Sequence, residues 1–272
     1  MFYPILFFIF GLFWGSFLNN IAYRLKTGED FFFLRSKCPS CQTVLSPKEL
    51  IPILSFIFLK GKCLHCQTKI SLRYPLTEIF TGLWVFILYL KINPLINFNF
   101  FLIFLFYFLL LSGIFVLALY DLDTFLVDDR ILIFLIVIGM IFNVLIYFQK
   151  LSPLDFSYIF NYFLPFPFYL QNLFSAFLFS SFLFLFYLLT KGEGLGFGDV
   201  KTIFVIGLFF KPGDMSLILV FSSFLGSLYG IYLLIKNKKF KIPIPFVPFM
   251  FLGIVSLFIF GKILTFNFFN IY

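Results

Sequence analysis

The sequence is short of charged residues, and this shortage restricts the class of protein. Asp, Glu, Lys and Arg make up 12% of the 272 residues, whereas an average soluble domain carries about 25%. Hydrophobic residues make up 62% of the chain, and they are gathered in long blocks. Such a chain cannot cover itself with polar side chains in water. The composition therefore excludes an ordinary soluble protein and places the apolar blocks in lipid.

The first apolar block, residues 2–22, lacks the marks of a removable signal peptide. It has no basic segment before it and no small-residue cleavage site, and it is longer than a secretory hydrophobic region. We therefore expect it to be a retained span. Further blocks approach the roughly 20 apolar residues that a helix needs to cross a bilayer. They are residues 75–90, 98–120, 131–148, 170–189, 215–235 and 245–260, with a shorter block at 200–210. The pattern predicts an all-α polytopic membrane protein with about eight transmembrane helices.

The basic residues are unevenly distributed. The formal net charge is +8, which could indicate a nucleic-acid partner, but topology explains it better. With the N-terminus outside, sixteen of the twenty Lys and Arg residues fall in the inner segments 23–74, 121–130, 190–201 and 236–244. Cytoplasmic loops are enriched in such residues. We therefore expect a multi-pass protein of the cytoplasmic membrane with its N-terminus outside, a lipid bilayer around it and no nucleic-acid partner.

Cysteine is rare and confined to one inner segment. The four cysteines form two pairs, Cys38-Pro-Ser-Cys41 and Cys63-Leu-His-Cys66, with 21 residues between them. This spacing is typical of a tetrahedral zinc site, and a reducing cytosol disfavours disulfides. Four thiolates leave no open position for water, so the Zn²⁺ would be structural. His65, the single histidine, is interpreted as a bystander.

These features predict three parts in the chain. Residues 1–22 would form the first transmembrane helix. Residues 23–74 would form a small zinc-ribbon-like cytosolic loop domain that holds the metal. Residues 75–272 would form a transmembrane domain that contains the acidic residues described next.

Acidic residues are scarce, and several lie where two inner segments meet the membrane. Asp121 closes the third expected span and Asp199 opens the short block. Ionisable groups at this depth are expensive and point to function. Two carboxylates that converge there would share a proton, and the pair could activate water against a peptide bond. Gly196 and Gly198 next to Asp199 would permit unusual dihedral angles and a close approach of a substrate backbone.

Several alternatives to the peptidase and to its acidic pair remain open on the residues alone. Asp123 competes with Asp121 for the catalytic role, and spacing does not choose between them. Asp128 or Asp129 fits the N-cap of the next helix. Paired membrane aspartates also suit a transporter or ion pathway, and a non-enzymatic assembly scaffold is a third hypothesis.

Several longer motifs narrow this choice. The sequence resembles the bacterial prepilin peptidases, or type 4 leader peptidases, over most of its length. It departs from their usual pattern at Lys26 and Asp128, which replace prolines, and at Val247, which replaces a glycine. The matching stretches are Gly15-Ser-Phe-Leu-Asn19, Tyr23-Arg24-Leu25, the two cysteine pairs, Ile70-Ser-x-Arg73-Tyr74-Pro75-x-x-Glu78, Asp121-x-Asp123 with Asp129, Gly196-x-Gly198-Asp199-x-Lys201 and Ile244-Pro-Phe-Val247-Pro-Phe.

The resemblance implies a specific enzyme. Asp121 and Asp199 would be the catalytic pair of a GxGD-type aspartic endopeptidase whose active site faces the cytosol of a bacterium. Its substrates would be type IV prepilins or pseudopilins. Family members with the cysteine loop often also methylate the new N-terminal residue with S-adenosylmethionine, and Gly61 matches a glycine linked to that activity. A plain structural turn is an equal interpretation of Gly61. The sequence contains no Gly-rich nucleotide loop of the soluble type.

Overall fold

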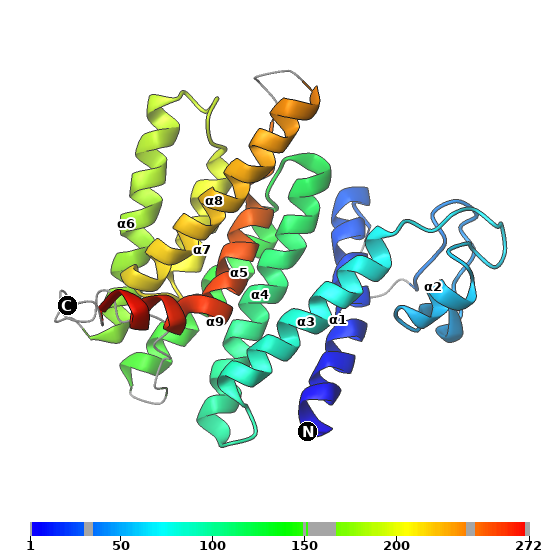
Figure 1. Ribbon diagram of the computed structural model, residues 1–272, viewed down its shortest axis with the longest axis horizontal. Helices are drawn as coiled ribbons and strands as arrows, with labels where there is room; N and C mark the ends of the chain where they lie inside the picture. Colours follow the sequence, from blue (N-terminus) through cyan, green and yellow to red (C-terminus); the bar gives the residue numbers. More distant parts are fainter. Residues whose placement is uncertain (1, 30–34, 149–150, 152–166, 238–242, 270–272) are drawn as a thin grey trace. The chain divides into compact units, whose positions relative to one another are not determined.

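The protein is described by a computed structural model that covers residues 2–29, 35–148, 151, 167–237 and 243–269, with the backbone alone for 262–269. It divides into two compact units, Met1–Lys91 and Ile92–Tyr272. Among the described residues, the regular secondary structure is helical, with two isolated β-bridges in the cysteine segment. The elements are α1 (Phe2–Thr27), the 3₁₀ helix η1 (Pro47–Leu50), α2 (Leu54–Phe58), α3 (Arg73–Ile92), α4 (Phe98–Thr124), α5 (Asp129–Tyr147), α6 (Phe168–Leu189), α7 (Phe197–Gly207), α8 (Pro212–Asn237) and α9 (Val247–Phe269) (Figure 1).

Most of the long helices have the length and composition of membrane spans. Among the described residues, six helices qualify: α1, α3, α4, α5, α6 and α8. This confirms a polytopic helical membrane protein, while the count of eight spans stays a prediction. Helix α7 has 11 residues, so at 1.5 Å per residue it extends only about 16 Å. That is roughly half of a 30 Å hydrocarbon core, so α7 alone does not cross it.

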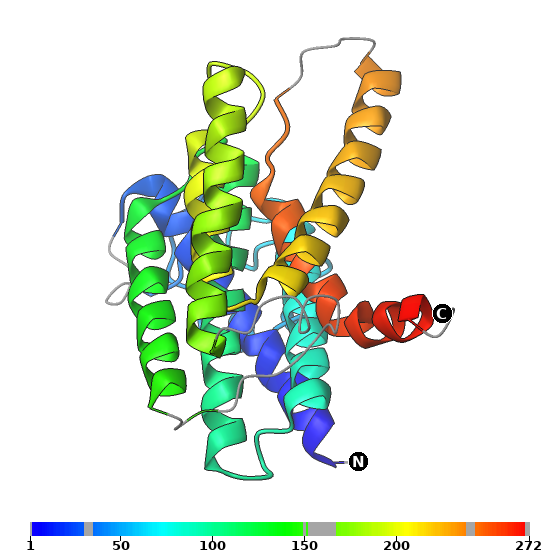
Figure 2. The ribbon, with the colours of Figure 1, turned by 90° about the vertical axis from the view of Figure 1, so that its left-hand side faces the viewer.

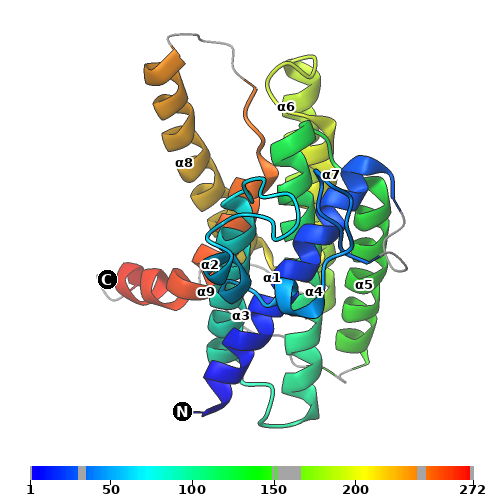
Figure 3. The same cartoon turned by 90° about the vertical axis from the view of Figure 1, so that its right-hand side faces the viewer.

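In the first unit, α1 and α3 lie against each other through small residues. A Cβ atom on Gly11 would stand 2.7 Å from the Cα of Gly82, and one on Gly15 would stand 2.9 Å from the Cα of Glu78. Small residues allow membrane helices to approach this closely. The cysteine segment, with η1 and α2, follows α1 and leads back into α3 (Figure 3). The cysteine segment therefore begins and ends at a pair of closely packed helices.

In the second unit, α4 is the central helix. It packs against α5 and α9, while α6 packs against α7, and α8 against α9 (Figure 2). The approach of α6 to α7 is close, because a Cβ on Gly207 would stand 2.5 Å from the Cα of Ala176. Helix α7 is thus enclosed by longer helices.

The C-terminal end of α7 lies inside the protein and is anchored by side chains. The Nδ2 of Asn143 on α5 donates to the carbonyl of Leu208 at 2.7 Å, and the hydroxyl of Tyr107 on α4 donates to the carbonyl of Phe209 at 3.2 Å. Both donors are buried. A helix end leaves carbonyls without intrahelical partners, and at membrane depth other protein groups must satisfy them. These two bonds fix where the short helix stops.

Candidate active site

Asp121 lies in the last turn of α4 and is 5% exposed. Its Oδ2 accepts a hydrogen bond from the backbone amide of Val247 at 3.2 Å. Val247 is the first residue of α9, where backbone amides have no partner inside the helix. The late Ile-Pro-Phe-Val-Pro-Phe motif therefore supplies a donor to the carboxylate. Sequence reasoning quoted this motif but missed its contact with Asp121.

Asp199 lies in the first turn of α7, outside the six helices that can span a membrane. Its Oδ2 accepts a hydrogen bond from the amide of Gly196 at 3.2 Å. Burial raises the pKa of Asp199, and the neighbouring charge of Asp121 raises it further, to about 7. This effect places the charge of Asp121 within electrostatic range of Asp199, while the catalytic pairing of the two residues stays a prediction. Two carboxylates so placed do not readily hold two negative charges.

The segment between α4 and α5 is attached to the start of α7. The Nζ of Lys201 lies 2.7 Å from the Oδ1 of Asp129. On the other side, a Cβ on Gly198 would stand 2.6 Å from the Cγ2 of Val127. An ion pair and a close packing contact thus connect the two stretches that carry the aspartates.

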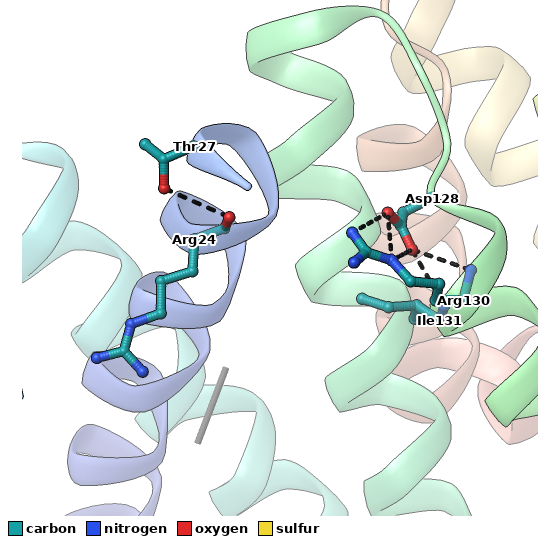
Figure 4. Close-up of polar contacts among 5 residues, drawn as sticks. All are labelled: Arg24, Thr27, Asp128, Arg130 and Ile131. Carbon is teal, nitrogen blue, oxygen red and sulfur yellow. Dashed lines mark hydrogen bonds and ion pairs between the residues drawn. The ribbon is translucent and has the colours of Figure 1, made fainter. Parts of the chain in front are cut away.

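Asp128 caps helix α5, as one of the alternatives predicted. Its Oδ1 accepts from the amide of Arg130 at 2.9 Å and from that of Ile131 at 3.4 Å, and its Oδ2 lies 2.9 Å from the Arg130 guanidinium (Figure 4). Figure 4 also shows the Thr27 hydroxyl donating to the Arg24 carbonyl in the last turn of α1. Asp129 forms the ion pair with Lys201 and does not cap the helix. The remaining rival, Asp123, is exposed.

The expectation that Gly196 and Gly198 adopt unusual dihedral angles is wrong. Gly196 has φ −74° and ψ 146°, an extended conformation open to any residue, and Gly198 has no positive φ. The small size of Gly198 matters instead, because Val127 occupies the space that a side chain would need. The glycine before Asp199 is therefore explained by packing.

The four cysteines converge in the first unit. The Sγ atoms of Cys38, Cys41, Cys63 and Cys66 all lie within 4.8 Å of one another, and those of Cys38 and Cys66 are 3.8 Å apart. A tetrahedral ion with metal–sulfur bonds of about 2.3 Å separates its sulfurs by about 3.8 Å. Hydrogen bonds from Thr68 lower the pKa of the Cys66 thiol to about 6, which favours the thiolate that a metal requires. The cluster can hold a metal ion.

The two cysteine knuckles have the same backbone. In each, the first cysteine's amide donates to the threonine five residues later, Cys38 to Thr43 at 3.0 Å and Cys63 to Thr68 at 2.9 Å. In each, the glutamine after the second cysteine has φ 59°. Sequence reasoning missed this duplication, although Cys-x-x-Cys-Gln-Thr occurs twice. A repeated local turn explains how both pairs present their sulfurs in the same way.

His65 and Gly61 lie beside the second knuckle. The Nε2 of His65 lies 3.4 Å from the Oε1 of Glu49, so the ring is directed at a carboxylate, as expected of a bystander. Gly61 has φ +68° and donates to the Phe56 carbonyl at 2.9 Å. The turn that was one interpretation of Gly61 is therefore present. Its part in methyl transfer stays a prediction.

Comparison with known proteins agrees with this architecture. Residues 9–92 match the model of the bacterial peptidase A24 N-terminal domain, and residues 108–231 match that of the type IV leader peptidase family. A relative from Bacillus subtilis is 32% identical, with 93% of each chain covered. One from Pseudomonas aeruginosa is 28% identical, covering 89% of this chain and 85% of its own, and one from Legionella pneumophila is 29% identical, covering 92% and 89%. No solved structure matches the chain.

The fold and the family matches thus define a helical membrane protein of the peptidase class. The chain belongs to the type IV leader peptidase family. The three relatives named above are each described as a prepilin leader peptidase/N-methyltransferase. These comparisons give no support to the transporter hypothesis.

Proposed function

We propose that this protein cleaves the leader peptides of type IV prepilins or pseudopilins and then methylates the new N-terminal residue. Asp121 and Asp199 are the catalytic pair of the cleavage step. The observation that carries the proposal is that the two carboxyl groups interact electrostatically: burial raises the pKa of Asp199, and the charge of Asp121 raises it further, to about 7. The family and the names of the relatives support the substrate class.

The acidic pair works with one proton shared between two carboxyl groups. The ionised carboxylate takes a proton from water as the water oxygen attacks the scissile carbonyl carbon, and the protonated carboxyl donates to the carbonyl oxygen. When the carbon–nitrogen bond breaks, the proton passes to the leaving amine. The amides of Val247 and Gly196 hold the two carboxylates in position throughout.

Charge distribution supports a location for this chemistry. If the N-terminus is outside, twelve of the twenty basic residues fall on the inner side in segments 23–74, 121–130 and 190–201, whether or not α7 crosses the membrane, and basic loops stay in the cytosol. The protein then lies in the bacterial cytoplasmic membrane with the acidic pair at its inner face.

The cysteine cluster holds a structural Zn²⁺ through Cys38, Cys41, Cys63 and Cys66. Four thiols at tetrahedral spacing fit this ion and leave no position for substrate water. Residues 23–74 then form a loop domain that the metal stabilises. Replacing Cys38 and Cys41 by Ser should abolish stoichiometric zinc in the purified protein and speed proteolysis within 35–72. If the loop stays protease-resistant after the metal is lost, the structural role is refuted.

Methylation requires a donor, and S-adenosylmethionine supplies an electrophilic methyl group for it. When bound, the donor would supply its methyl group to the new terminal amine, which would release a proton, and the donor would leave with a neutral sulfur. Gly61 contributes by shaping the turn before the second knuckle.

The test is incubation of the purified full-length protein with a prepilin, followed by mass analysis of the products. Wild type should yield one cut, with one added methyl group when the donor is present. Asp121→Asn and Asp199→Asn should each abolish the cut, whereas Asp123→Asn, the exposed neighbour on the same helix, should retain it. Cleavage by either of the first two variants at the wild-type rate would refute the catalytic assignment. A matched unfolding temperature for all three excludes misfolding as the cause.

A further inference from the structure

Helix α2 in the cysteine segment leaves an apolar face uncovered. Leu54, Ile57 and Phe58 are 51%, 60% and 79% exposed. With about 3.6 residues per turn, these three positions lie on one side of the helix. The opposite side carries Ser55 and Phe56, which line a cavity inside the first unit. The helix is therefore packed on one side, and the apolar face on the other side needs a partner.

A hydrogen bond fixes α2 to a helix that can span the membrane. The amide of Ile53, directly before α2, donates to the Oε2 of Glu78 on α3 at 2.8 Å. Glu78 is 6% exposed and lies in the second turn of α3, one of the candidate spans. The start of α2 is thus attached to a buried group of the span itself.

The contact between α1 and α3 gives the level of this bond along the membrane. A Cβ on Gly15 would stand 2.9 Å from the Cα of Glu78. Gly15 and Thr27, the last residue of α1, are twelve positions apart, and twelve residues of helix extend about 18 Å. This distance exceeds the reach of one glutamate side chain, so α2 begins well before the level at which α1 ends. In Figures 1 and 3, α2 lies between the heights of the two ends of α1.

Basic residues flank the apolar face. Lys48 lies on η1, which packs against α2, and Lys60 and Lys62 follow α2 within four residues. All three are exposed. Residues 35–72 contain six Lys or Arg and one acidic residue, Glu49. A surface of this charge repels a basic partner and attracts anionic lipid headgroups.

We infer that α2 is an interfacial helix, with Leu54, Ile57 and Phe58 among lipid acyl chains and the flanking lysines at anionic headgroups. Interfacial helices combine an apolar face with basic residues at the polar boundary. The partner is lipid because the face lies at the level of a span, where lipid contacts any surface that protein does not cover. Three side chains are also too few for a stable protein interface, which buries about 800 Å² on each partner.

The inference requires only that α1 and α3 span a membrane, and it does not depend on the proposed catalytic activity. It gives the cysteine segment a third attachment to the bilayer besides the two spans at its ends. The metal cluster is then held against the membrane surface and does not extend freely into the cytosol.

Fluorescence quenching by lipids with brominated acyl chains tests the depth of α2. The full-length, zinc-loaded protein is reconstituted at one copy per nanodisc, and the signal of the two native tryptophans, measured in wild type, is subtracted. Phe13→Trp, at an exposed position within α1, serves as the lipid reference, and Thr27→Trp, exposed at the end of α1, as the reference outside the acyl chains. Quenching of Phe58→Trp should be closer to that of Phe13→Trp. Quenching closer to that of Thr27→Trp would overturn the inference.

Hydrogen exchange in nanodiscs tests the lysines. Amides of residues 51–62 should exchange more slowly with phosphatidylglycerol in the bilayer than in pure phosphatidylcholine. A triple replacement by Gln at Lys48, Lys60 and Lys62 should remove this difference. The charge-matched control is the triple replacement by Gln of three exposed lysines elsewhere, Lys91, Lys191 and Lys236. An unchanged difference in the first variant, or its loss in both, would overturn the headgroup contacts.

A second pair of variants tests the apolar face. Ile57→Ser combined with Phe58→Ser should speed exchange of the amides of residues 54–62 about tenfold or more, the factor that corresponds to one aromatic side chain leaving lipid. Val44→Ser combined with Leu64→Ser, at exposed positions of the same segment outside α2, should leave exchange there unchanged. Zinc content and circular dichroism should match wild type in both, which excludes misfolding. Equal exchange in the two double variants would overturn the inference.

Discussion

The amide of Val247 offers a direct test of how Asp121 is held. Val247→Pro removes the N–H that donates to Oδ2 at 3.2 Å, yet proline suits the first position of a helix. A hydrogen bond to a charged group contributes about 1.5–3 kcal/mol. With a factor of ten per 1.4 kcal/mol, kcat for prepilin cleavage should fall about 10- to 150-fold, while KM changes little.

The control at the same position is Val247→Ala. Alanine removes more of the buried side chain than proline does but keeps the N–H. Val247→Ala should therefore lower the unfolding temperature more than Val247→Pro does, and lower kcat less. Cleavage is followed by mass spectrometry over a range of prepilin concentrations, with unfolding temperatures measured in parallel. If Val247→Pro keeps the kcat of Val247→Ala, the amide does not support Asp121 and the reasoning is refuted.

Three further predictions concern the same unit. The pKa of Asp199 is raised to about 7, so its proton is lost as the pH rises through 7. Because the acidic pair needs one proton, kcat/KM for cleavage should fall about tenfold per pH unit well above pH 7. A flat profile of kcat/KM from pH 7 to 9 would contradict this. Asn143→Leu leaves the Leu208 carbonyl without its side-chain donor and should lower the free energy of unfolding by about 1–3 kcal/mol; an unchanged denaturation midpoint in a lipid-detergent titration would count against the anchor. Gly198→Ala should reduce cleavage, because its Cβ meets Val127, and Val127→Ala in the same chain should restore part of the rate; no rescue would mean that the clash is not the cause.

The helices could be predicted closely because each depends on its own residues. The expected block at 98–120 lies within α4, and that at 131–148 corresponds to α5 with a shift of one or two residues at its ends. Apolar blocks of this length have one solution in lipid, a helix that satisfies its own backbone. The short block at 200–210 was recognised as unusual for the same reason. It is α7 at Phe197–Gly207.

The contacts that hold the site could not be read from the sequence. The bond from Val247 to Asp121 joins positions 126 apart, and that from Asn143 to Leu208 joins positions 65 apart. Such pairs depend on how whole helices pack, and no local pattern encodes them. The repeated Cys-x-x-Cys-Gln-Thr is different, because the turn that it forms depends only on neighbouring residues. This repeat could therefore have been recognised from the sequence.

Both departures from the usual motifs in the second unit are tolerated for structural reasons. Val247 stands where a glycine is common, but Asp121 uses only its backbone amide, which every residue except proline provides. Asp128 stands where a proline is common, and both residue types favour a helix start: proline through its fixed φ, and aspartate through the cap it forms here. The groups that position the acidic pair are largely backbone amides at the starts of α7 and α9. Side chains at those points can therefore vary as long as each helix begins at the same residue, and an insertion before Val247 should be far more damaging than any substitution there that keeps the N–H.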